Sequence, residues 1–198
     1  PEIIRPALQI IGIREDVKAV AGFYMLLYRD RTLFLADTTV NLNPNAEVLA
    51  DIAINTARAA RSFGIQPKVA FLSYSNFGSV RNEDLDRLTD ALDIVKQRDP
   101  GLMVEGEMQA HLAINSKLRQ ADYPFCTLQG EANVLIFPNL HAANSAYRLL
   151  SELSEGQILG PILMGMNHPV NVLSQESLVQ DVVNMTALAV LEAEEGVM

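Results

Sequence analysis

Short apolar runs alternate with longer segments of helical periodicity along almost the whole chain, and this alternation constrains the fold more than any other feature. The central runs are apolar throughout rather than at every second position, which is typical of strands buried on both faces of a parallel or mixed sheet. We therefore predict an α/β fold with helices on both faces of a mostly parallel or mixed sheet. Strands are expected at 7–13, 19–28, 32–37, 68–75, 102–106, 133–138 and 156–165.

The segments between these runs carry signals for the start and end of helices. Asn43 or Asn45 can cap a helix that ends near Gly64, and Asn82 can cap a second helix that closes at Pro100. Further helices are expected up to about residue 121, over 140–153, and at the C-terminal end, where Leu178, Val182, Met185 and Ala189 are spaced for burial.

Charge and composition exclude several classes of protein. The net charge is −9 and no run of Lys and Arg occurs, which argues against a nucleic-acid-binding protein. No apolar run approaches the ~20 residues that span a bilayer, and no secretory signal is visible, so a cytoplasmic location without membrane contact is expected. The chain starts at Pro1 without Met, and we interpret it as a piece of a longer polypeptide.

Neither cysteine nor histidine points to a structural or metal site. Cys126 is the single cysteine of the sequence and cannot form an internal disulfide. The three histidines do not have the spacing of zinc ligands, and no metal site is expected. They are interpreted as ordinary surface or half-buried residues: His111, His141 and His168.

Polar, glycine-bearing motifs follow the predicted strands, at the edge where α/β folds bind ligands. These motifs are SYSNFGS, EGEMQ, FPNLHAAN and, before the last helix, NVLSQES. Glu105 and Glu107 look at first like a paired-carboxylate site. Because no sugar-binding aromatic side chain or metal partner accompanies them, we interpret Glu107 as structural.

Six motifs, in this order, resemble the phosphotransacetylase (phosphate acetyl/butyryl transferase) family: LADTTVNLNP, PKVAFLSYSNFGS, VEGEMQAHLAI, GEANVLIFPNLHAANSAY, GPILMG and PVNVLSQES. The resemblance implies a two-domain α/β fold of the isocitrate-dehydrogenase-like type, with coenzyme A and acyl phosphate meeting in the cleft between the domains. It also implies that residues 1–157 form one domain and that 158–198 are the returning part of a second, incomplete domain.

A narrower resemblance is carried by RSFGIQPKVAFLSYSNFGS, LRQADYPFCTLQGEANVLIFPNL and VVNMTALAVLEA. These stretches are similar to the C-terminal phosphotransacetylase-like domain of bacterial NADP-dependent malic enzymes. That likeness implies a regulatory and assembly domain, a homo-oligomer, and acetyl-CoA or CoA as the ligand, with acetyl-CoA as an inhibitory effector. NADP and a divalent metal would belong to the malate-oxidising domain of the parent enzyme, and no cofactor is expected in this fragment.

The family motif for acyl transfer places a serine beside an arginine, with an aspartate six residues after the arginine. These positions are Ser174, Gln175 and Asp181 here, so a neutral glutamine replaces the cation that would hold the phosphate. Phe77 also stands where the family usually has lysine, and Val172 where it has aspartate. We therefore expect the transfer chemistry to be lost and no catalytic residue to remain.

Ligand binding is expected to survive at six positions: Ser75, Gly78, Ser79, Asn144, Ser174 and Asp181. The alternatives are a plain turn for the glycine loop (residues 73–79, SYSNFGS), helix capping for Asn144 and Ser174, and a solvated helix face for Asp181. Two other functions stay open: an active phosphate acetyltransferase that tolerates Gln175, and an assembly domain that binds no ligand.

Overall fold

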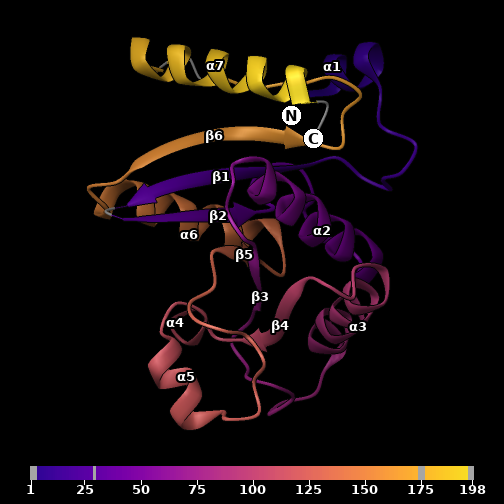
Figure 1. Cartoon of the computed structure of the whole chain (residues 1–198). Helices are drawn as coiled ribbons and strands as arrows, with labels where there is room; N and C mark the ends of the chain where they lie inside the picture. Colours follow the sequence, from indigo (N-terminus) through magenta and orange to yellow (C-terminus); the bar gives the residue numbers. More distant parts are fainter. Residues whose placement is uncertain (1–3, 29, 174–176, 196–198) are drawn as a thin grey trace.

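A computed structural model describes residues 4–28, 30–173 and 177–195 of the chain. Six strands form one sheet in the order β4-β3-β5-β2-β1-β6 (Figure 1). The pairs β2–β5, β5–β3 and β3–β4 are parallel, while β1 is antiparallel to both β2 and β6, which confirms the predicted mixed sheet. The strands are β1 (Ala21–Tyr28), β2 (Arg31–Ala36), β3 (Lys68–Leu72), β4 (Met103–Met108), β5 (Val134–Ile136) and β6 (Gln157–Met164).

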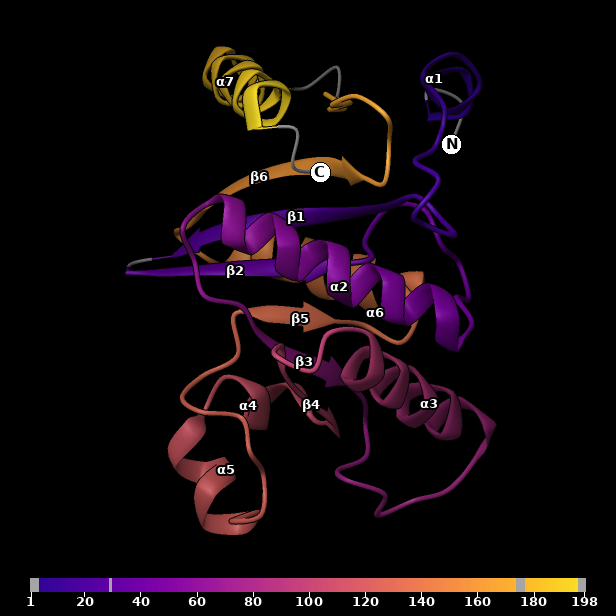
Figure 2. The same cartoon turned by 45° about the vertical axis from the view of Figure 1, so that its right-hand side comes forward.

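Helices cover both faces of the sheet, as predicted. Helices α2 (Ala46–Ser62) and α3 (Glu83–Arg98) pack on one face, and α6 (Leu140–Leu153), α4 (Ala110–Ala113) and α5 (Ser116–Asp122) lie on the other side (Figure 2). Neighbouring residues of a strand point to opposite faces: Phe34 joins the α2 side of the core and Leu35 the α6 side. Each central strand is therefore buried on both faces, which explains its continuous apolar sequence.

Asparagine side chains cap four of the helices in the described residues; in α5 the cap is Asn115, which accepts a hydrogen bond from the N–H of Leu118. Asn45 accepts a hydrogen bond from the N–H of Val48, Asn82 from Leu85, and Asn139 from Ala142. The predicted caps at Asn45 and Asn82 are thereby confirmed. Each cap satisfies one of the N–H groups that the first turn of a helix leaves without an intrahelical partner.

The strand expected at 7–13 is wrong, because this segment lies mostly in helix α1 (Ile4–Ile11). Its apolar residues follow the helical spacing i, i+3, i+4 and i+7, and they pack beside Val20 and Leu163. A run this short is ambiguous between helix and strand. The residues that form the apolar stripe are Ile4, Ala7, Leu8 and Ile11.

Helix α7 (Val179–Glu195) lies over β6, at the edge of the sheet (Figure 1). The face predicted to be buried is only partly correct: Met185 is buried, but Leu178 and Val182 are exposed and Leu188 takes part in the core instead.

The expected domain boundary falls where β6 begins. Since β6 pairs with β1, residues 157–164 belong to the main sheet, while the division into two domains stays a prediction.

Arg119 is fully buried although it carries a permanent positive charge. Its guanidinium donates hydrogen bonds to main-chain oxygens only: those of Leu112 and Ala113, at 2.7 and 3.1 Å, and those of Leu128, at 3.0 Å, and Gly130. These contacts hold the end of α4 against the segment that leads into β5.

None of the helices in the described part of the chain has the length and hydropathy needed to cross a membrane.

Candidate functional site at the carboxyl edge of the sheet

The glycine loop after β3 uses its own N–H groups internally. The N–H of Ser75 donates to Ser73 Oγ, that of Asn76 to Ser79 Oγ, and that of Ser79 to the oxygen of Asn76. The hydroxyls of Ser75 and Ser79 lie 2.9 Å apart and share a hydrogen bond. The loop therefore offers hydroxyl oxygens and few free N–H groups to a phosphate.

Glu107 holds the rest of this loop from the neighbouring strand β4. Its buried carboxylate accepts the N–H of Gly78, at 3.0 and 3.3 Å to the two oxygens, and its main-chain oxygen accepts the N–H of Phe77 at 2.7 Å. A carboxylate thus already occupies the donors at which an anion was expected. Glu105 makes separate contacts, with the hydroxyl of Thr127 and, at 3.9 Å, with Lys96.

Phe77 turns into an aromatic cluster. Its backbone has a φ of 48°, a left-handed conformation that costs a residue other than glycine roughly 1–2 kcal/mol. Its ring lies 4.9 Å from the ring of Tyr123 and 5.2 Å from that of Phe125, both between centroids. This packing, worth roughly 0.5–1.5 kcal/mol per pair beyond the buried area, offsets the backbone strain.

Asn144 and Asp181 both make contacts within the chain. The Asn144 amide lies 3.5 Å from the main-chain oxygen of Thr38, which follows β2 at the same edge of the sheet. Asp181 Oδ2 accepts the N–H of Leu178 at 2.8 Å, so the aspartate caps its own helix. Val172 packs in the small core between α1 and β6, and Ser174 and Gln175 lie outside the described residues.

The structure brings Ser75, Gly78 and Ser79 together but does not bring Asp181 to them. The glycine loop follows β3, whereas α7 lies over β6, and four strand spacings separate β3 from β6 in the sheet. At ~4.8 Å for each spacing, these strands are roughly 19 Å apart. Asn144 lies between, beside the end of β2.

A cavity of about 350 Å³ opens at the carboxyl ends of β3 and β5, next to the glycine loop. Its wall includes Ser73 and Tyr74 after β3 and Asn139 at the start of α6. The wall also contains a cation, Arg87 of α3, about one helical turn beyond the cap Asn82. The sequence analysis did not single out Arg87, because no recognisable motif surrounds it. One guanidinium nitrogen of Arg87 lies 3.2 Å from Asp84. Its Nε is buried and has no partner among the described residues.

The Nε of Arg87 is the donor left for a phosphate or carboxylate, because one terminal nitrogen contacts Asp84 and donates to the main-chain oxygen of Pro138 at 3.4 Å. The apolar remainder of the cavity suits an aliphatic or acyl group. Metal chemistry has no evident ligand set, because the described residues contain no group of three or more His, Cys, Asp and Glu side chains that could hold an ion.

Comparison with known proteins adds to this geometry. The family model described as phosphate acetyl/butaryl transferase matches residues 1–190. A phosphate acetyltransferase from Clostridium acetobutylicum is 38% identical over 99% of this chain and 61% of its own length. An NADP-dependent malic enzyme from Salmonella typhimurium is 42% identical over 93% of this chain and 24% of its own length. The crystal structure of a phosphotransacetylase from Streptococcus pyogenes matches with a TM-score of 0.91 and 34% identity, over 97% of this chain and 59% of that one.

Each of these proteins is therefore longer than the chain, which spans at most 61% of their length.

Proposed function

The chain belongs to the phosphate acetyl/butaryl transferase family, and on that premise we propose that the protein binds coenzyme A and acetyl phosphate and transfers the acetyl group between them. One observation carries the proposal: transferases match this chain over 97–99% of its length in sequence and in fold. We place the ligands at the carboxyl edge of the sheet, around the cavity that contains Arg87.

The transfer needs a cation at the phosphate and a donor at the carbonyl oxygen. The thiolate of coenzyme A attacks the acetyl carbon, the carbon–sulfur bond forms, and the bond from carbon to the phosphate oxygen breaks. We propose Arg87 as the cation at the phosphate. Ser174, which stands at the family's serine position, is the proposed donor to the carbonyl oxygen. Gln175 supplies hydrogen bonds but no charge, so we expect turnover below that of a family member with arginine there.

A regulatory domain of an NADP-dependent malic enzyme is the second candidate. It is favoured by the 42% identity to the Salmonella typhimurium enzyme, and by the glycine loop, whose donors are already bonded to Glu107. Acetyl-CoA would then be an effector, and NADP and a metal ion would belong to another domain of the full protein. In both proposals the protein is a cytoplasmic homo-oligomer.

An assay with acetyl phosphate and coenzyme A separates the two candidates. The acetyl-transfer proposal predicts that the full-length protein forms acetyl-CoA from these substrates at a rate above that of a protein-free blank. Gln175→Arg should raise this rate by at least 10-fold, since one preorganised donor is worth about 10²–10³ in rate. Gln180→Arg, which adds the same charge on the exposed face of α7, is the matched control and should have no effect.

If neither the natural protein nor Gln175→Arg forms acetyl-CoA, transfer is wrong. The regulatory candidate then predicts that acetyl-CoA inhibits malate oxidation by the full-length protein. A coupling of ~1–3 kcal/mol would change malate affinity by roughly 5- to 150-fold. Unchanged malate oxidation would leave assembly as the remaining role.

A further inference from the structure

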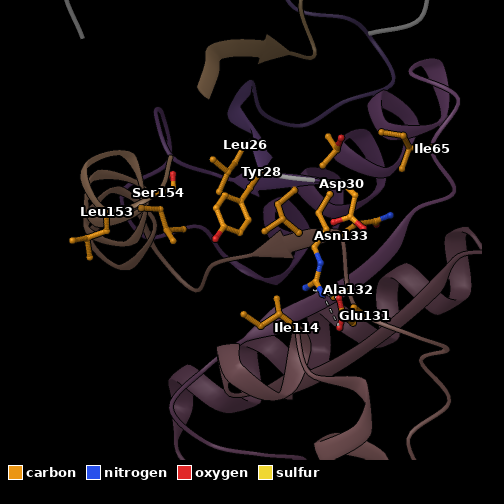
Figure 3. Close-up of a pocket in the computed structure, with 14 residues that line it drawn as sticks. Leu26, Tyr28, Asp30, Ile65, Ile114, Glu131, Ala132, Asn133, Leu153 and Ser154 are labelled. Atoms are coloured by element: carbon orange, nitrogen blue, oxygen red, sulfur yellow. Dashed lines mark hydrogen bonds and ion pairs between the residues drawn. The ribbon is translucent and has the colours of Figure 1, made fainter. Parts of the chain in front are cut away.

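A second cavity, of about 620 Å³, lies at the opposite edge of the sheet, where the parallel strands begin (Figure 3). Arg31 opens β2, Asn133 precedes β5, and Ile65 leads into β3, so this cavity faces away from the carboxyl edge. Its volume is within the roughly 300–1,000 Å³ of small-molecule sites. A ligand here would leave the site proposed for acyl transfer free.

The cavity has a mostly apolar wall. Leu26 and Leu33 come from the β1–β2 hairpin, and α6 contributes the last part of its length, where Leu153 is 80% exposed. Leaving such side chains in water is unfavourable, at about 25 cal/mol per Å² of apolar area. An aliphatic molecule that covers them is therefore a suitable ligand. The apolar wall residues are Leu26, Leu33, Ile65, Ile114, Ala132, Leu150 and Leu153.

The described polar groups of the cavity carry an excess of one negative charge, that of Asp30. Arg31 and Glu131 form an ion pair at 2.7 Å, drawn as a dashed line in Figure 3, and this pair is neutral. Asp30 adds a carboxylate that has no partner among the described residues. Ser154 Oγ is buried and likewise unpaired within the described part of the chain, so a hydrogen-bonding group is also available.

From these walls and charges we infer a binding site for a small amphipathic molecule with an aliphatic body and a protonated amine. The aliphatic body covers the leucine and isoleucine wall, and the ammonium group lies beside Asp30.

Three probes with one tail test the charge preference: octylammonium, octanol and octanoate. Each is titrated into the chain while methyl resonances of Leu33, Ile114 and Leu153 are followed by NMR. We expect saturable shifts at these methyl groups and an affinity for octylammonium about two- to five-fold higher than for octanol, the range of an exposed ion pair. Octanoate should bind most weakly. Absence of saturable binding, or tightest binding of octanoate, would refute the inference.

Two substitutions locate the site. Leu153→Arg places a cation in the wall and should lower the affinity for octylammonium at least five-fold. Leu149→Arg, on the same helix but outside the wall, should leave this affinity unchanged. Both side chains are exposed, at 80% and 62%, so both variants should fold. Asp30→Asn should remove the preference for octylammonium over octanol. Equal effects of the two arginine variants, or a preference that survives Asp30→Asn, would overturn the assignment.

Discussion

Replacing Glu192 by glutamine should stabilise the folded chain, and the gain should grow as the pH rises. Glu192 is a carboxylic acid on the buried face of α7, with an exposed fraction of 5%. Burial raises its pKa from the ordinary 4.5 to about 7, although Asn171 lowers it somewhat by hydrogen bonding. The contact with Asn171 is a weak one, because no hydrogen bond of good distance and angle reaches either carboxyl oxygen from the described residues.

The sign follows from the proton balance of the two states. Between pH 4.5 and 7 the folded chain binds more protons at Glu192 than the unfolded chain does, so stability falls as the pH rises through this window. The whole loss, reached above pH 7, is about 3 kcal/mol, because a pKa difference of 2.5 counts 1.36 kcal/mol for each unit. About 1 kcal/mol of this is already lost at pH 5.5.

Urea unfolding at pH 5.5 and pH 8 measures the effect. Glu192→Gln should exceed the natural chain by about 1 kcal/mol at pH 5.5 and by about 3 kcal/mol at pH 8. Glu194→Gln, an exposed position on the same helix, is the matched control and should show a small difference at both pH values. If the gain from Glu192→Gln is the same at pH 5.5 and pH 8, the carboxyl group is not buried in its neutral form and the reasoning fails.

Three further substitutions test the packing that holds the candidate site. Arg119→Met should cost at least 3 kcal/mol in urea unfolding, since it leaves buried main-chain oxygens without donors, and a cost below 1 kcal/mol would contradict this. Asn82→Ala should cost about 1 kcal/mol, the worth of a helix cap, whereas no change would mean that water replaces it. Gly106→Ala should lower the thermal midpoint by several degrees, because a Cβ would lie 2.8 Å from the oxygen of Phe71 at a φ of 149°. An unchanged midpoint would show that β4 can shift.

Local signals predicted most of the fold. Caps, turn residues and continuous apolar runs are properties of neighbouring residues, so the α/β class and the starts of α2 and α3 could be derived from them. Helix α1 was missed because seven apolar-rich residues fit a strand and a helix equally well. The face of α7 was misplaced because burial depends on β6, which the helix contacts only in three dimensions.

The candidate site was less predictable, because its contacts come from distant parts of the sequence. Gly78 was expected to bind an anion, yet its N–H is bonded to Glu107, 29 residues later. Arg87 has no motif around it, and only the structure shows that it lines a cavity together with Asn139. Sequence patterns report what a residue can do, while the partner that uses this capacity is set by the fold.

The place of β5 in the sheet has a consequence for how the chain folds during synthesis. Strands β1 and β2 pair with each other, as do β3 and β4, but the two pairs meet only through β5. This strand has three residues, Val134–Ile136, and it is made after β1, β2, β3 and β4, including its two sheet neighbours β3 and β2. Until it emerges from the ribosome, the apolar edges of β2 and β3 stay open to water and to other chains. Late closure of this gap makes the nascent chain most prone to aggregation just before β5 emerges from the ribosome.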